Sequence, residues 1–254
     1  MKFKNKTIII TGGSSGIGAA TAILFSREGA EVYVLDKKNL DYAATARIHF
    51  LLCDVSASNQ IQRAIASIRQ KVAQIDYLFC NAGIHLFANV EESTVAEIQQ
   101  VIATNLLGTI YCLQQVLPSM KKQGLGAIVL MASDQAFVAK EQCAIYGATK
   151  AAIAQLAKST ALDYATYGIR VNCVCPGTID TPMYQAVISQ FQQKTGLAAS
   201  LIREQVAKKL PLQRVGKPEE VAELVGFLCS EASSFMSGAL IDIDGGYTIQ
   251  GSDS

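Results

Sequence analysis

Tyr146 and Lys150 are residues whose types and spacing could do chemistry. They are four positions apart in the segment YGATK, so on a helix they would lie on one face. Free tyrosine titrates at about pH 10, but a cation held alongside favours the phenolate. Lowering the pKa of Tyr146 by about three units would need roughly 4 kcal/mol. The pair could therefore exchange a proton with an alcohol, although this spacing is also common on exposed helix faces.

A glycine-rich turn near the N-terminus could bind a phosphate group. The β-branched run Thr7–Thr11 leads into Gly12-Gly13-Ser14-Ser15-Gly16-Ile17-Gly18, which opens a segment of helix length. Glycines let backbone N–H groups approach a pyrophosphate, and the helix N-terminus adds partial positive charge. The strand–turn–helix context is typical of dinucleotide-binding proteins, whereas glycine spacing alone also occurs at corners that bind nothing.

Asp36 bears on the choice of dinucleotide. It ends the second apolar run, about twenty residues after Gly18, where a carboxylate can accept hydrogen bonds from ribose hydroxyls. A carboxylate at this place repels a 2′-phosphate, so we expect NAD rather than NADP. Lys37 and Lys38 keep the NADP alternative open, and Asp36 could instead cap a turn.

Apolar runs of strand length alternate with helix-length segments along the chain. We expect strands at Thr7–Thr11, Glu31–Leu35, Ile48–Cys53, Tyr77–Cys80, Ala127–Ala132, Arg170–Cys175 and Ala239–Ile243. We expect helices at Ile17–Arg27, Ser56–Val72, Thr94–Lys122, Ala144–Tyr167, Pro182–Lys209 and Pro218–Leu228. This alternation predicts an α/β protein, a single-domain doubly wound Rossmann fold over residues 1–254. Its seven-stranded sheet would be mostly parallel, with helices on both faces.

Composition excludes several classes of function. The 22 basic and 21 acidic residues leave a net charge of +1, which gives no field to attract nucleic acid or an anionic membrane. The seven cysteines lack the spacing of a zinc site or a secreted disulfide framework. No apolar run reaches the length of a membrane span or a signal peptide. We expect a soluble cytoplasmic protein with reduced cysteines and no metal.

The predicted helix around Ala144–Ala161 is small and apolar nearly all round. A helix on a sheet needs one apolar stripe, so a second apolar face implies a second partner. We expect this helix in the interface of a symmetric homo-oligomer, a tetramer or a dimer. The alternative is the plain helix propensity of alanine.

Taken in order, these features resemble the classical short-chain dehydrogenase/reductase family over almost the entire chain. The further segments that carry the resemblance are Asp54-Val55, Asn81-Ala82-Gly83, Asn105 within TNLLG, Ser133 at the end of the fifth strand, Pro176-Gly177, Thr178–Pro182 and Asp244-Gly245-Gly246. Two departures are Cys80, where many members have the first Asn of an Asn-Asn-Ala-Gly turn, and Thr149 in place of Ser. Neither removes a group that the mechanism needs.

The resemblance implies the catalytic residues Asn105, Ser133, Tyr146 and Lys150. Tyr146 would be the general acid/base and Ser133 would hydrogen-bond the substrate oxygen. Lys150 would lower the pKa of Tyr146 and bind the nicotinamide ribose, and Asn105 would hold a relay water at a local break in its helix. The implied cofactor contacts are Gly12, Ser14, Ser15, Gly16, Ile17, Gly18, Asp36, Lys37, Asp54, Val55, Asn81, Ala82, Gly83, Tyr146, Lys150, Pro176, Gly177, Ile179 and Thr181.

The substrate would meet the segment after Ser133 and a lid at about 178–215, which is long enough to close and exclude water. The implied substrate contacts are Ser133, Gln135, Gln142, Tyr146, Met183 and Tyr184. Their polar character favours a sugar, polyol or hydroxy acid over a steroid, and Lys140 could meet a carboxylate. His85 follows the Asn81-Ala82-Gly83 turn and is either a substrate contact or a packed residue.

The function that these features imply is an NAD(H)-dependent interconversion of a secondary alcohol and a ketone, or of a sugar and a lactone. Three alternatives stay open. The chain could be an NAD-binding sensor or scaffold without catalysis, or an NADP-dependent carbonyl reductase. It could also be an epimerase or dehydratase, although such chains usually carry a larger C-terminal substrate domain.

Overall fold

The computed structural model describes residues 1–250 and contains one seven-stranded sheet. Its strands are β1 (Thr7–Thr11), β2 (Glu31–Asp36), β3 (Ile48–Leu52), β4 (Tyr77–Cys80), β5 (Gly126–Met131), β6 (Ile169–Pro176) and β7 (Leu240–Ile243). The order is β3-β2-β1-β4-β5-β6-β7, and every pair of neighbours is parallel. The predicted doubly wound Rossmann fold is confirmed. The strand order reverses between β1 and β4, where such sheets open a crevice at their carboxyl ends.

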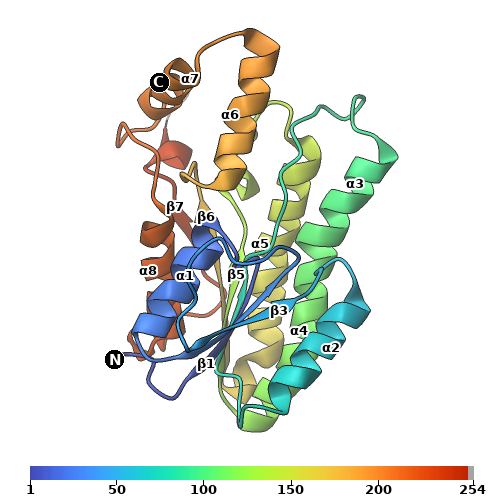
Figure 1. The fold of residues 1–254 in the computed structure, drawn as a ribbon, viewed down its shortest axis with the longest axis vertical. Helices are drawn as coiled ribbons and strands as arrows, with labels where there is room; N and C mark the ends of the chain where they lie inside the picture. The colour runs from blue at the N-terminus through green and yellow to red at the C-terminus, as the bar shows by residue number, and fades with distance from the viewer. Residues whose placement is uncertain (251–254) are drawn as a thin grey trace.

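Helices cover both faces of the sheet (Figure 1). One core joins the sheet to α2 (Ser58–Arg69), α4 (Gly108–Gln123) and α5 (Ala144–Tyr164). The other joins it to α1 (Gly16–Arg27) and α8 (Pro218–Cys229). Successive residues of a strand point to opposite faces, so Ile9 of β1 enters the first core whereas Ile8 and Ile10 enter the second. This two-sided burial explains why the strands are apolar at nearly every position.

The segment predicted as one helix over Pro182–Lys209 forms two helices. They are α6 (Pro182–Thr195) and α7 (Ala199–Lys208), and α6 ends at Gly196 with φ +71°. Glycine adopts this left-handed conformation at little cost and so commonly ends helices. The two helices lie beyond the carboxyl ends of the strands, at the top of Figure 1, in the segment predicted as a lid.

The segment predicted as one helix over Thr94–Lys122 is continuous but not uniformly α-helical. It begins as α3 (Val95–Val101), passes through a π-helical turn at Ile102–Leu107, and continues as α4. Within Val95–Gln123 lies a stretch long and apolar enough to cross a membrane by composition, but half of it is buried inside the protein. The apolar residues of α4 belong to the core that joins the sheet to α2, α4 and α5, as expected for a core helix of an α/β domain.

Candidate active site

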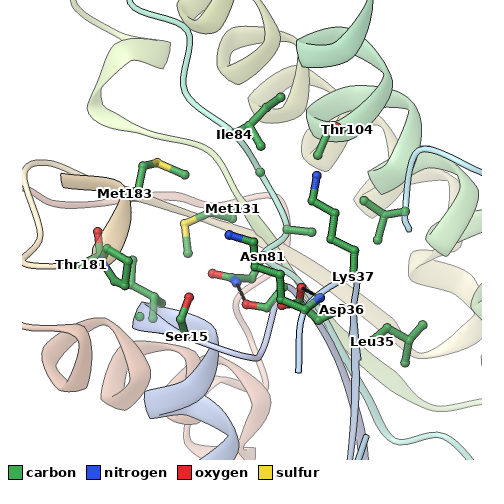
Figure 2. A pocket seen from close by; sticks show the side chains of 18 of the residues that line it. Ser15, Leu35, Asp36, Lys37, Asn81, Ile84, Thr104, Met131, Thr181 and Met183 are labelled. Atoms are coloured by element: carbon green, nitrogen blue, oxygen red, sulfur yellow. Dashed lines mark hydrogen bonds between the residues drawn. The ribbon is translucent and has the colours of Figure 1, made fainter. Parts of the chain in front are cut away.

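A cleft opens beside the carboxyl ends of β1, β2 and β4, at the reversal of strand order. The predicted cofactor residues that line it are Gly12, Ser15, Gly16, Ile17, Asp36, Lys37, Asp54, Val55, Asn81, Ala82, Gly83, Lys150 and Thr181. Figure 2 shows Thr181 and Met183 on one side of the cleft, Leu35, Asp36 and Lys37 on the other, and Asn81 between them. The fold thus gathers these residues from six separate segments of the chain around one space.

The glycine-rich turn fits a pyrophosphate. Gly12 and Gly16 have φ values of +65° and +54°, and a Cβ on Gly12 would lie 2.7 Å from the Cα of Ala82. A Cβ on Gly18 would lie 2.2 Å from the Gly12 carbonyl oxygen, so Gly18 allows the turn to pack on α1. The Ser15 side chain makes no capping hydrogen bond at the start of α1. The first-turn N–H groups therefore remain available to an anion.

Asp36 is held at the far end of this cleft by backbone donors. Its Oδ2 accepts a hydrogen bond of 3.1 Å from Ser14 N, and its Oδ1 accepts one of 3.0 Å from Lys38 N. Ser14 itself is buried and does not line the cleft. The Ser56 hydroxyl and, to a lesser degree, the Lys37 ammonium hold the pKa of Asp54 below its usual range. The Lys37 charge thus acts on a neighbouring carboxylate of the same cleft.

A second pocket adjoins the first and shares Ile17, Met131, Thr181 and Met183 with it. Its wall includes the predicted residues Ser133, Gln135, Tyr146, Met183 and Tyr184, and also Pro176, Gly177 and Ile179, which we had expected at the cofactor. Gln142, expected at the substrate, does not line this pocket. Its Oε1 instead accepts a hydrogen bond of 3.2 Å from Lys194 Nζ of α6.

Some lining residues of the second pocket had not been predicted as site residues. They are His85, Phe87, Asp134, Lys140, Glu141, Cys143, Val187 and Val206. His85, Lys140 and Cys143 stand in segments that the sequence had indicated. Phe87, Val187 and Val206 carried no signal, because an apolar residue in a loop or lid could equally pack in a core.

Ser133, Tyr146 and Lys150 meet where the two pockets join. Ser133 follows β5, and its side chain lies close enough to that of Tyr146 to lower the pKa of the phenol, which α5 brings to the same place. Lys150 lies on the same face of α5, with Nζ 5.5 Å from the centroid of the Tyr146 ring. Its Nζ donates a hydrogen bond of 2.9 Å to the Met131 carbonyl. Tyr146 lines the second pocket and Lys150 the first, so the pair spans both.

Comparison with known proteins shows the family to which this chain belongs. A sequence profile described as "Enoyl-(Acyl carrier protein) reductase" matches residues 12–248. Cis-4-hydroxycyclohexanecarboxylate dehydrogenase of Sinomonas cyclohexanicum is 37% identical over 97% of this chain and 98% of its own. The chain belongs to the short-chain dehydrogenase/reductase family. The suspected resemblance is confirmed.

Two further relatives are named as dehydrogenases of different alcohols. Meso-2,3-butanediol dehydrogenase of Serratia marcescens is 33% identical over 98% of this chain and 96% of its own. Aldohexose dehydrogenase of Thermoplasma acidophilum, solved in ligand-free form, has a TM-score of 0.92 and 34% identity, and covers 99% of this chain and 97% of its own. The chain is therefore an oxidoreductase of CH–OH groups that uses a nicotinamide cofactor.

Burial dominates the titration of the two central residues. It raises the pKa of Tyr146, with smaller contributions from Asp134 and Cys143, while the hydrogen bond with Ser133 opposes the rise. Burial also lowers the pKa of Lys150 to about 8, and Cys173 and Cys175 partly offset this. Within the protein alone, Tyr146 is thus a protonated phenol at neutral pH. Lys150 is not among the groups that shift the pKa of Tyr146 in the protein alone, so its expected effect on Tyr146 stays a prediction for the complex with cofactor.

Asn105 lies in the π-helical turn and is fully buried. Its Oδ1 accepts a hydrogen bond of 2.9 Å from Ile84 N, and its Nδ2 donates to Ile84 O at 3.0 Å and to Thr149 Oγ1 at 3.1 Å. The side chain therefore fixes the loop after β4 against α5. These three bonds engage its side-chain amide; that Asn105 holds a relay water at the local break in its helix stays a prediction.

His85 lies against the reactive tyrosine. The centroids of the two rings are 4.5 Å apart, and His85 Nε2 is 3.6 Å from Cys143 Sγ. Burial, and then the charges of Lys140 and Lys150, lower the pKa of His85 to about 4. His85 is thus a neutral part of the wall of the second pocket. Among residues 1–250, no group of three or more His, Cys, Asp or Glu side chains is placed to hold a metal ion.

Proposed function

We propose that the protein is an NAD(H)-dependent dehydrogenase/reductase that interconverts a secondary alcohol and a ketone, or a sugar and a lactone. The observation that carries this proposal is the meeting of Ser133, Tyr146 and Lys150 at the junction of the two pockets. A carbinol in the second pocket would face the phenol on one side and the cofactor cleft on the other.

The proposed roles follow from the contacts of each side chain. Ser133 orients the substrate oxygen, and Tyr146 takes the hydroxyl proton during oxidation or returns it during reduction. When bound, an oxidised nicotinamide would supply positive charge and the hydride-accepting chemistry of the oxidation. Lys150 binds the cofactor ribose beside Tyr146 and stabilises the phenolate. Asn105 holds Ile84, and so positions the loop after β4 at the wall of the cofactor cleft.

Asp36 supports NAD as the cofactor. Its carboxylate lines the adenosine end of the cleft, where it can accept hydrogen bonds from ribose hydroxyls and would repel a 2′-phosphate. We predict that Asp36→Ala lowers kcat/KM with NAD by at least tenfold and narrows the preference for NAD over NADP. Steady-state kinetics with both cofactors test this. An unchanged ratio of the two kcat/KM values would contradict the assignment.

The substrate we propose is polar: a sugar, a polyol or a hydroxy acid. Gln135, Lys140 and the Tyr184 hydroxyl line the second pocket, and Tyr184 Oη is buried without a hydrogen-bond partner among the described residues. Phe87, Val187 and Val206 add apolar surface, so one part of the substrate would be carbon-rich. A panel of sugars, polyols, hydroxy acids and sterols, run with NAD and with NADP, decides the class. Turnover confined to sterols would contradict this proposal.

The same panel separates the alternatives. A sensor or scaffold would bind NAD tightly and turn over no alcohol. An NADP-dependent carbonyl reductase would reduce ketones with NADPH and use NADH poorly. An epimerase or dehydratase would give a product without net NADH. The presence of Ser133, Tyr146 and Lys150 in one contact network favours the dehydrogenase.

We also propose that the protein is a single-domain, cytoplasmic homo-oligomer whose partner is a small molecule. All seven cysteines are free and buried, as suits a reducing compartment. The lid at about 178–215 contains α6 and α7, which reach the substrate pocket through Met183, Tyr184, Val187 and Val206.

A further inference from the structure

A buried carboxylate stands next to the proposed catalytic serine and has no role in the mechanism above. Asp134 follows Ser133, and its side chain is only 2% exposed. Its Oδ1 accepts a hydrogen bond of 2.8 Å from the Ser133 hydroxyl. A carboxylate removed from water is costly unless it is paired and hydrogen-bonded. Its neighbours should therefore include a cation.

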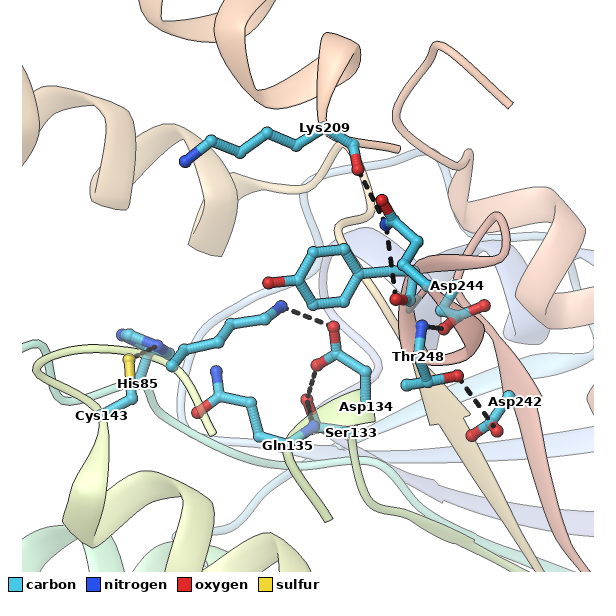
Figure 3. Close-up of polar contacts among 12 residues, drawn as sticks. His85, Ser133, Asp134, Gln135, Cys143, Lys209, Asp242, Asp244 and Thr248 are labelled. Atoms are coloured by element: carbon cyan, nitrogen blue, oxygen red, sulfur yellow. Dashed lines mark hydrogen bonds and ion pairs between the residues drawn. The ribbon is translucent and has the colours of Figure 1, made fainter. Parts of the chain in front are cut away.

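That cation is Lys140. Its Nζ lies 2.5 Å from Asp134 Oδ2 and 4.7 Å from the centroid of the Tyr247 ring. Asp134 belongs to the short 3₁₀ turn Asp134–Ala136, Lys140 to the loop before α5, and Tyr247 to the segment after β7. Figure 3 shows the chain of hydrogen bonds from Ser133 through Asp134 to the lysine ammonium. Three separate parts of the chain thus hold this ion pair in place.

The bond to Asp134 limits the hydrogen bonds that the Ser133 hydroxyl can make with other groups. A serine hydroxyl has one hydrogen, and here it is donated to Asp134. While it is, Ser133 Oγ can only accept hydrogen bonds, as it does from Gln135 N at 3.3 Å. To donate to a substrate oxygen, the Ser133 hydroxyl must turn away from Asp134. The strength of the bond to Asp134 therefore sets how easily the serine serves the substrate.

The charge of Asp134 also reaches Tyr146 and helps to raise its pKa. The other groups that face Tyr146 are His85, from the loop after β4, and Cys143 and Lys150, from the start and the body of α5. The lid helix α6 adds the uncharged Tyr184 to the same pocket.

Further carboxylates stand on the other side of Asp134. Asp242 on β7 has a raised pKa, caused first by burial, then by Asp244, with a smaller contribution from Asp134. Lys140 is the cation in direct contact with Asp134, so it offsets negative charge at this end of the pocket.

We propose that Asp134 and Lys140 form a positioning pair for the reaction. Asp134 fixes the orientation of the Ser133 hydroxyl, and Lys140 weakens that hold and balances the negative charge beside Tyr146. Neither side chain touches the reacting atoms in this role. A hydrogen bond to an unshared carboxylate is stronger than one to a carboxylate that also binds an ammonium. Loss of Lys140 alone would therefore lock Ser133 onto Asp134 and disfavour the Tyr146 phenolate. This inference rests on the proposed function.

The test is the pH dependence of kcat for alcohol oxidation by the unmodified protein, Lys140→Met, Asp134→Asn and the double variant. Lys140→Met should move the limb governed by Tyr146 upward by about one pH unit, so that kcat at neutral pH falls about tenfold. The double variant lacks both charges and should recover to within about threefold of the unmodified protein. Lys140→Arg keeps the charge and should keep the profile.

An unchanged profile in Lys140→Met, or losses that simply multiply in the double variant, would overturn the inference. So would a raised KM with an unchanged kcat profile, since Lys140 would then be a substrate contact. If Lys140→Met does not fold, as judged by NAD binding and the thermal midpoint, Lys140→Gln gives the same readout. No turnover of any alcohol by the unmodified protein would overturn the proposed function and this inference together. A null result confined to the variants leaves the proposed function intact.

Discussion

His85 illustrates how single residues acquire properties from the fold. Its sequence position after the Asn81-Ala82-Gly83 turn indicated either a substrate contact or a packed residue. In the structure it lines the second pocket, where we propose that the substrate binds, and contacts Tyr146 and Cys143. Burial and two nearby lysines lower its pKa to about 4, so it remains uncharged where free histidine begins to protonate.

This lowered pKa has a consequence for stability. The unfolded chain protonates His85 below about pH 6.5, whereas the folded protein keeps it neutral down to about 4. The folded state therefore loses stability as the pH falls from about 6.5 to 4. We predict that, between pH 7 and pH 4.5, the free energy of unfolding falls by about 2 kcal/mol less in His85→Gln than in the unmodified protein. Urea unfolding at pH 7 and pH 4.5 measures it, with His49→Gln, at the other histidine, as the matched control. Equal losses in His85→Gln and the unmodified protein would refute the prediction.

The residues of the candidate site differ in how far the sequence could predict them. Tyr146 and Lys150 carry a spacing, Asp36 a strand end, and Gly12 a turn, so each could be placed before the fold was seen. Phe87 and Val206 carry no such mark. Their position in the pocket depends on how the loop after β4 and the lid fold back, which local patterns do not determine.

At the level of elements, the π-helical turn at Ile102–Leu107 shapes the site. Elsewhere in the helices, Thr21, Thr109 and Thr195 donate their hydroxyls to the carbonyl four residues back, at 2.8, 2.8 and 2.7 Å. Thr104, inside the turn, does not. Its Oγ1 is buried without a partner among the described residues, and the residue lines the cofactor cleft. The altered turn thus leaves a buried, unsatisfied hydroxyl on a residue of the cleft wall.

We predict that Thr104→Val weakens NAD binding about fivefold, because a buried hydroxyl that a ligand satisfies contributes about 1 kcal/mol. Thr104→Ser should bind as the unmodified protein does. Isothermal titration calorimetry with NAD gives the dissociation constants. Thr109→Val is the control, since its hydroxyl is used within the helix and its loss should leave NAD binding unchanged. Equal affinity in Thr104→Val would show that the hydroxyl does not contact NAD.

The observed bounds of the strands and helices show which boundaries the sequence pattern could predict and which it could not. The seven strands were predicted to within one residue at each end, because the five inner strands are buried on both faces and continuously apolar, and the edge strands β3 and β7 are still mostly apolar. The π-helical turn was implied only by family resemblance, since the apolar pattern continues through it. The break between α6 and α7 did have a signal, Gly196, which the helix-prone residues around it obscured.

At the scale of the whole molecule, α5 presents two different faces. Ile153, Ala154, Ala157 and Ala161 are buried in the core, whereas Ala144, Ala148 and Ala151 are exposed and Leu162 is 80% exposed. The exposed face of α5 thus carries small and apolar side chains, together with the exposed polar residues Gln155, Lys158 and Ser159. A partner subunit covering it remains a prediction, supported by this exposed strip of small and apolar side chains.

We predict that Ala148→Glu reduces the size of the assembly, because it places a charge at the centre of the proposed interface. Size-exclusion chromatography with light scattering reads out the mass in solution. Ala44→Glu, in the exposed loop between β2 and β3, is the matched control and should leave the mass unchanged. A full-size assembly in Ala148→Glu would place the interface elsewhere.

The central claim is that Tyr146 transfers the proton, and the most direct measurement compares Tyr146→Phe with the unmodified protein on the best alcohol of the panel. We predict that kcat falls by about a thousandfold or more, as for loss of a general acid/base. NAD binding should change less than about twofold, because Lys150 and the cofactor cleft are intact. Unchanged turnover in Tyr146→Phe would contradict the account.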